Sequence, residues 1–282
     1  MRVREMTQVR VRTRDSAVLH LEGSRTGQAV LLIHGLGYAS WAAHQLRHAL
    51  GDDLALWSVD NRGTGRSTRG LEELSIDLLA EDAAVAIEAL GRPAIVVGYS
   101  MGGYVAQLLA LARPELVNQL VLLGTSPGGP EAVSVPAPTL KAWLDAANLT
   151  PEQYARRTMP LSFREGWPQS HSNEYEDVIQ ARLTYPTSSA IWREQYKACE
   201  RFLQTGARTA ELAVPTLVIH GGADRVLPAD NGRAIARMLP DARYRELPDA
   251  GHLLHLEAPD VIATEVRRFV APSIPHYGNT KE

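Results

Sequence analysis

Five short runs of apolar residues constrain the fold of this chain more than any other feature. The runs are AVLLIHG (29–35), LALWSVD (54–60), AIVVG (94–98), QLVLLG (119–124) and PTLVIHG (215–221). Near-continuous apolar runs of this length are typical of strands that are buried on both faces of a parallel sheet. Weaker patterns predict three further strands, around Val9 and Val11, at 17–23 and at 242–247.

Segments with helical patterning lie between these runs. The segment SIDLLAEDAAVAIEALG (75–91) begins with an N-cap serine, has apolar residues at helical spacing and ends at Gly91. Segments 101–112 and 259–270 predict two more helices. Strands that alternate with helices indicate an α/β fold, in which a mostly parallel sheet lies between two layers of helices.

The alternation stops between residues 129 and 211. This segment is rich in aromatic residues and has helical patterning without a buried-strand signal. We interpret it as a helical insertion into a core that comprises residues 1–128 and 212–282. Over residues 130–210, nine Lys or Arg balance nine Asp or Glu, so the composition implies neither an acidic nor a basic substrate. We expect four aromatic residues of the insertion to line a substrate pocket: Trp143, Trp167, Tyr185 and Trp192.

Charge and composition exclude several classes of protein. A formal charge of −3 argues against a nucleic-acid-binding protein, which usually has a large basic excess. Residues 93–112 carry no charge, but glycines, Ser100 and Gln107 interrupt them, so a buried strand followed by a buried helix explains them better than a membrane span. The N-terminus lacks the apolar core of a secretory signal, and the single cysteine, Cys199, fits a reducing compartment. We therefore expect a cytoplasmic protein.

The pattern G-x-S-x-G occurs twice, and it is typical of a nucleophilic serine on a sharp turn between a strand and a helix. The residue after such a serine opens the helix, so its free N–H can stabilise an oxyanion. In GYSMG an expected strand precedes Ser100, and Met101 opens an expected helix. In GTSPG the residue after Ser126 is Pro127, which has no N–H to donate. We therefore predict Ser100 as the nucleophile and Met101 as an oxyanion donor.

A nucleophilic serine also needs a base, an acid that orients the base, and further amide donors. Asp224 in HGGAD and His252 in AGH each follow an expected strand, which places them at the carboxyl edge of the sheet. The chain order serine, acid, histidine is the one expected for this architecture. HGLG (34–37) ends another buried strand, and the N–H of Leu36 is a candidate second oxyanion donor.

Two of these assignments have alternatives. Asp230 and Asp249 are alternative acids, in which case Asp224 is a turn or helix-cap residue. His255 is an alternative base, although it lies past the Gly-His step, at the edge of the last expected helix.

Two further patterns are similar to metal or cofactor sites but lack essential parts. His44 and His48 are four residues apart on an expected helix, but Gln45 stands where the metalloprotease pattern has Glu. GTGRST (63–68) is similar to a dinucleotide-binding loop, but Thr68 replaces its last glycine, and no suitably placed acid follows. We expect neither a metal nor a cofactor.

Together the motifs resemble the α/β-hydrolase superfamily. The matching pieces are HGLG, DNRGTGRS, GYSMGG, HGGADRVLP and AGHLLHLEAP, which span residues 34–259 in the order of that superfamily. The resemblance implies an α/β-hydrolase fold with a mostly parallel eight-stranded sheet and a helical cap, here residues 129–211. It also implies these roles: Ser100 nucleophile, Asp224 acid, His252 base, Leu36 and Met101 backbone donors. Within the superfamily, GYSMGG is similar to bacterial esterases, enol-lactonases and cofactor-free perhydrolases.

The expected function is hydrolysis of a carboxylic ester or lactone of a small to medium organic molecule, through an acyl-enzyme on Ser100. The same residues suit hydrolysis of a thioester or C–C bond, or peracid formation. A cyclase or ligand receptor on this fold is a second class of function. The expected partner is a small molecule and not a nucleic acid or a membrane; whether the chain forms a homodimer stays open.

Overall fold

An eight-stranded sheet forms the centre of the computed structural model, which describes residues 6–271 except 147 and 240. The strands are β1 (Thr7–Arg12), β2 (Val18–Gly23), β3 (Gln28–Ile33), β4 (Leu54–Val59), β5 (Ala94–Tyr99), β6 (Val117–Leu123), β7 (Thr216–Gly221) and β8 (Arg243–Leu247). Their order in the sheet is β1-β2-β4-β3-β5-β6-β7-β8. β2 runs antiparallel to β1 and β4, and the other neighbours are parallel. The predicted α/β fold with a mostly parallel sheet is thereby confirmed.

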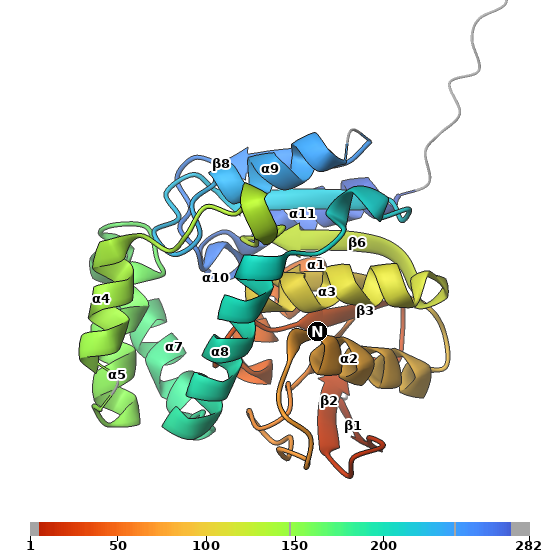
Figure 1. Ribbon diagram of the computed structural model, residues 1–282, viewed down its shortest axis with the longest axis horizontal. Coiled ribbons are helices and arrows are strands. Elements are labelled where there is room, and N and C mark those ends of the chain that lie inside the picture. Colours follow the sequence, from red (N-terminus) through yellow and green to blue (C-terminus); the bar gives the residue numbers. More distant parts are fainter. Residues whose placement is uncertain (1–5, 147, 240, 272–282) are drawn as a thin grey trace, which may run out of the picture.

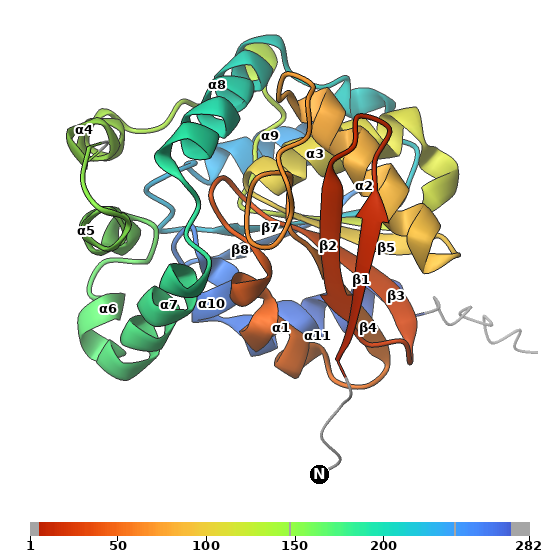
Figure 2. The same cartoon turned by 90° about the horizontal axis from the view of Figure 1, so that it is seen from below.

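Helices cover both faces of the sheet, because its central strands are apolar on both sides. In β3, Leu31 and Ile33 belong to one buried cluster and Val30 and Leu32 to the other, as the alternation of side chains along a strand requires. The helices of the core are α1 (His44–Leu50), α2 (Ile76–Leu90), α3 (Met101–Ala112), α9 (Asp230–Met238), α10 (Leu254–Glu257) and α11 (Pro259–Val270). Figure 2 shows α2, α3 and α9 on one side of the sheet and α1 and α11 on the other.

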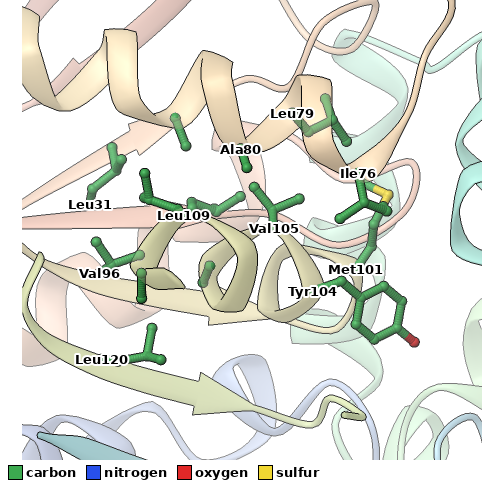
Figure 3. Packing of buried hydrophobic residues seen from close by; sticks show 14 of the residues in the cluster. Leu31, Ile76, Leu79, Ala80, Val96, Met101, Tyr104, Val105, Leu109 and Leu120 are labelled. Carbon is green, nitrogen blue, oxygen red and sulfur yellow. The ribbon is translucent and has the colours of Figure 1, made fainter. Parts of the chain in front are cut away.

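Helix α2 begins and ends where its sequence predicts. The Ser75 hydroxyl accepts a hydrogen bond from the N–H of Leu78, at 3.1 Å, and caps the helix. Gly91 ends it with a φ of 73°, a left-handed conformation that glycine adopts without strain. Between these caps, Leu79 and its neighbours pack against Val105 of α3, as Figure 3 shows. This packing fixes α3, whose first residue is Met101, against the sheet.

Five short 3₁₀ helices supplement these elements within the described residues. They are η1 (Ser40–Ala43), η2 (Pro114–Leu116), η3 (Gly129–Glu131), η4 (Met159–Leu161) and η5 (Thr209–Glu211).

Residues 129–211 fold into helices, and no strand lies among those of them that the structure describes. The α-helices are α4 (Ala137–Ala146), α5 (Pro151–Thr158), α6 (Trp167–Ser170), α7 (Ser172–Thr184) and α8 (Ser189–Thr205). Figures 1 and 2 show them gathered at one end of the sheet, on the left in both views. We refer to residues 129–211 as the cap.

The cap is joined to the core at the loops that follow the strands. Gln195 of α8 accepts a hydrogen bond from the N–H of Gly37, after β3, at 2.8 Å. The carbonyl of Ser162 accepts one from the N–H of Leu253, after β8, at 2.8 Å. Arg225, after β7, donates to the carbonyl of Pro160 at 2.7 Å. These bonds set the cap over the carboxyl ends of the strands.

Residues 93–112 form β5 and α3, joined by a sharp turn. Among the helices that the structure describes, none is both long enough and apolar enough to cross a membrane.

Candidate active site

Ser100 lies on a strained turn between the end of β5 and the start of α3. Its φ of 53° and ψ of −120° lie in a region that residues with a side chain rarely adopt. Three hydrogen bonds hold the turn: the Ser100 N–H donates to the Leu123 carbonyl at 2.9 Å, and the Ser100 carbonyl accepts from Gly103 N–H and the Thr125 hydroxyl at 2.8 Å. The turn therefore presents the Ser100 side chain at the carboxyl edge of the sheet.

The glycines of GYSMGG are needed because α3 starts so close to the neighbouring strand. A Cβ added to Gly102 would lie 2.0 Å from the carbonyl oxygen of Ile33 at the end of β3. That distance is far below van der Waals contact, so a side chain at this position would push the start of α3 off the sheet.

A chain of hydrogen bonds joins Ser100 to His252 and His252 to Asp224. The Ser100 Oγ is 2.9 Å from His252 Nε2, and His252 Nδ1 is 2.7 Å from Asp224 Oδ2. A carboxylate can only accept, so the proton of the imidazole lies on Nδ1. Nε2 is therefore free to accept the hydroxyl proton of Ser100, which is what a general base must do.

The Asp224 carboxylate is buried and fully engaged. Its Oδ1 accepts hydrogen bonds from the backbone N–H groups of Val226 and Leu227, at 2.7 and 2.8 Å. Burial by itself would raise the pKa of Asp224, but its interactions with His252 and His220 outweigh burial and hold that pKa at about 2. Asp224 is therefore a carboxylate at neutral pH.

His220 belongs to the same cluster, which sequence reasoning missed. Its Nε2 is 2.8 Å from the carbonyl of Leu227 and 3.4 Å from Asp224 Oδ2. The side chain is buried and belongs to β7, four residues before Asp224 in the sequence. A histidine at the end of a buried strand carries no sequence signal that separates this supporting place from a core position.

Leu36 and Met101, the predicted oxyanion donors, line the same cavity as Ser100. The N–H of Met101 is one of the amides at the start of α3 that have no acceptor within the helix. The structure thus brings both residues to the cavity that Ser100 lines.

The alternative residues lie elsewhere. Ser126 is fully buried, and its hydroxyl accepts a hydrogen bond from the N–H of Gly128 at 3.1 Å. His255 is buried against the Tyr99 ring at a centroid distance of 4.3 Å, and burial lowers its pKa to about 3. Asp230 forms an exposed ion pair with Arg233 at the start of α9.

A cavity lies above Ser100, between the core and the cap. It encloses about 800 Å³ of space between the surrounding atoms, with the open solvent at its mouth included. Trp143 and Trp192, two of the predicted pocket residues, lie in its wall. So do Tyr38, Ser162 and Arg182, which the sequence did not single out.

Trp167 and Tyr185, the other two residues expected to line a pocket, are not in the wall of this cavity. Trp167 stacks between Phe163 and His171, with centroid distances of 4.3 and 4.7 Å, and is part of the core of the cap. Tyr185 is 40% exposed and lies under the guanidinium of Arg66, away from the cavity. Aromatic character alone does not separate a residue that fills the cap from one that faces a ligand.

No group of three or more His, Cys, Asp or Glu side chains suited to a metal ion occurs in the described ranges, 6–146, 148–239 and 241–271. His44 and His48 are both exposed, on the solvent side of α1.

The fold and the site together define a class of protein. A mostly parallel eight-stranded sheet, with a serine on a strained strand-to-helix turn and a histidine and acid after later strands, is the architecture of α/β hydrolases. The sequence matches the alpha/beta hydrolase fold family over residues 28–259. The chain belongs to this family and is an enzyme of the hydrolase type.

Several known proteins are similar along nearly their whole length. BpoC of Mycobacterium tuberculosis, provisionally named a non-heme bromoperoxidase, is 31% identical over 259 residues, which cover 90% of this chain and 97% of BpoC. The pimeloyl-[acyl-carrier protein] methyl ester esterase of Nitrosomonas europaea is 28% identical over 251 residues, covering 86% and 96%. Among solved structures, a thermophilic esterase from Thermogutta terrifontis is 26% identical with a TM-score of 0.77, covering 93% and 97%.

Proposed function

We propose that this hydrolase cleaves a carboxylic ester or lactone of a small to medium organic molecule, through an acyl-enzyme on Ser100. The observation that carries the proposal is the hydrogen-bonded sequence from Ser100 to His252 to Asp224 beneath an apolar, aromatic cavity. Relatives named as esterases support the bond type.

In the first half of the reaction, His252 Nε2 takes the proton of Ser100 as its oxygen attacks the substrate carbonyl. Asp224 stabilises the imidazolium and keeps Nδ1 protonated. The N–H groups of Leu36 and Met101 donate to the oxyanion of the tetrahedral intermediate. His252 then gives its proton to the leaving alkoxide, which departs as an alcohol and leaves the acyl group on Ser100.

In the second half, His252 takes a proton from water, and the hydroxide attacks the acyl carbonyl. The intermediate collapses, Ser100 recovers its proton from His252, and the carboxylic acid leaves. In a lactone, the alcohol released in the first half stays attached to the acyl group, so a single hydroxy acid is the product.

Peracid formation is a second candidate. It is favoured by the similarity to BpoC, whose name as a bromoperoxidase indicates a reaction with a peroxide. Hydrogen peroxide would replace water in the second half, so that the acyl group leaves Ser100 as a peroxycarboxylic acid. Measuring peracetic acid from acetate or ethyl acetate and hydrogen peroxide tests this use of the site.

The experiment that tests the proposal is hydrolysis of a panel of p-nitrophenyl esters and small lactones by wild type, Ser100→Ala and Ser126→Ala. We expect a burst of about one p-nitrophenol per chain with wild type, and a loss of roughly 10⁴-fold in kcat with Ser100→Ala. Ser126→Ala is the matched control, because its hydroxyl is buried away from the cavity, and should hydrolyse the panel like wild type. Equal losses in the two folded variants would refute Ser100 as the nucleophile.

A further inference from the structure

Arg182 of α7 is the one Lys or Arg in the lining of the cavity above Ser100, as far as the structure describes the chain. Its guanidinium lies over the ring of Tyr38, 5.2 Å from the centroid, and 5.9 Å from the centroid of Tyr154. Both contacts are of the cation–π type, in which the positive charge lies near an aromatic ring. Most other walls of the cavity are aromatic or aliphatic.

No carboxylate of the described chain forms an ion pair with Arg182 within 4.0 Å. Arg156, another cation of the cap, shows the contrast, since it binds Glu152 and Glu176 at 2.8 Å on the surface. Glu200 lies in the same cavity wall but is exposed and interacts with Tyr196. A half-buried cation in an aromatic cavity is stabilised most by an anion that enters with a ligand.

The cap holds Arg182 beside the backbone of the loop that contains Leu36. A Cβ added to Gly37 would lie 3.8 Å from Nη2 of Arg182. The Gly37 peptide is bound on both sides by the cap, through its N–H to Gln195 at 2.8 Å and through its carbonyl to Thr187 at 3.2 Å. The guanidinium therefore lies beside the residue that follows Leu36, whose N–H donates to the oxyanion in the proposed function.

Two hydroxyl groups accompany the guanidinium. Tyr38 and Ser162 are buried and line the cavity with Arg182. Burial raises the pKa of Tyr38, and Arg182 and Ser162 oppose that rise through their interactions with its hydroxyl. A guanidinium with two hydroxyl donors is a set that binds a carboxylate.

We propose that Arg182, with the hydroxyls of Tyr38 and Ser162, is a specificity subsite for a carboxylate on the substrate. The inference rests on the proposed function for the reacting end and adds the class of substrate: an ester or lactone that carries a second, anionic carboxyl group. The carboxylate can belong to the acyl part, as in a half-ester of a dicarboxylic acid, or to the alcohol part, as in an acylated hydroxy acid.

Paired substrates test the subsite. For the acyl side, the monomethyl esters of succinic, glutaric, adipic and pimelic acid are each compared with the analogue in which a carboxamide replaces the carboxylate. For the alcohol side, ω-acetoxy carboxylates of matching length are compared with their carboxamides. The readout is the ratio of kcat/KM for the anion to that for the neutral partner.

The expected ratio for wild type is about tenfold to a hundredfold at the best chain length, since a hydrogen-bonded charge contributes about that factor. Arg182→Gln should bring the ratio to about one, and Arg182→Lys should give an intermediate value because it keeps the charge but loses the fork of donors. Arg193→Gln is the matched control: Arg193 is exposed on α8 and outside the lining of this cavity, so its ratio should equal that of wild type.

A wild-type ratio near one for both substrate series, or the same ratio in wild type and Arg182→Gln, overturns the subsite. A binding measurement separates this from failure of the proposed function. Adipate, which cannot be hydrolysed, should raise the melting temperature of wild type and of Ser100→Ala but not that of Arg182→Gln, and adipamide should raise none of them. If adipate stabilises wild type and no ester is cleaved, the proposed reaction is wrong while the subsite stands. If adipate stabilises wild type and Arg182→Gln equally, the subsite is wrong whatever the reaction.

Discussion

Replacing Asp224 with Asn is a sharp test of how the site orients His252. Oδ1 of Asp224 accepts two backbone N–H groups, at 2.7 and 2.8 Å, whereas Oδ2 faces His252 Nδ1 at 2.7 Å. In the Asn variant the amide oxygen must take the Oδ1 position, because an NH₂ group there would meet two donors. The NH₂ group, which can only donate, then faces Nδ1, so Nδ1 must act as the acceptor. The proton of the imidazole moves to Nε2, and His252 cannot take the proton of Ser100.

The expected size of this effect is a loss of about 10⁴-fold in the chemical step, which corresponds to about 5.4 kcal/mol at 1.36 kcal/mol per tenfold. Stability should change little, because the two backbone hydrogen bonds to the side chain remain. The variant therefore separates the tautomer of His252 from the integrity of the fold.

Two assays measure this loss: kcat for p-nitrophenyl acetate, and the rate at which a fluorophosphonate modifies Ser100. The second needs no knowledge of the natural substrate. Asp230→Asn is the control, because Asp230 lies in an exposed ion pair at the start of α9. A loss of less than about tenfold in a folded Asp224→Asn protein would refute the reasoning, and an equal loss in Asp230→Asn would point to the other acid.

Three further predictions concern stability. Ser100→Gly should be more stable than Ser100→Ala by about 1 kcal/mol, because only glycine relieves the strain at a φ of 53°, and calorimetry that finds the usual order, alanine above glycine, contradicts this. Gly102→Ala should lower the free energy of unfolding by about 1–3 kcal/mol in denaturant titrations, because its Cβ meets the Ile33 carbonyl; unchanged stability would show that α3 starts further from β3. Burial raises the pKa of Glu257 from 4.5 to about 7, so the folded protein binds that proton more tightly than the unfolded chain, and this contribution to stability is lost as pH rises from 4.5 through 7. The melting temperature of Glu257→Gln relative to wild type should therefore rise across that interval, and a constant difference would contradict the assignment.

Sequence alone sufficed for the framework because the relevant physics is local. The apolar runs located the strands, since a strand buried on both faces cannot tolerate polar residues. The choice between Ser100 and Ser126 depended on the residue that follows each serine: Met101 opens an expected helix, whereas Pro127 has no N–H. Ser126 is indeed buried, with its hydroxyl bonded to Gly128 N–H.

The cap was less predictable because its contents depend on three-dimensional packing. Trp167 and Trp192 have the same chemistry, yet one stacks inside the cap and the other faces the cavity. Arg182 was missed for a related reason: the balanced charge of residues 130–210 implied no charged substrate. The number of Lys and Arg residues in the segment does not say which of the nine side chains faces the cavity. For Arg182 this depends on its packing against Tyr38 and Tyr154.

The most direct test of the central claim is the intact mass of wild type, Ser100→Ala and Ser126→Ala after exposure to a fluorophosphonate. An activated serine attacks phosphorus, releases fluoride and adds one phosphonyl group to the chain. The account predicts a single adduct on wild type and on Ser126→Ala, and none on Ser100→Ala. An adduct on Ser100→Ala that disappears in Ser126→Ala, or no adduct on folded wild type, would contradict it.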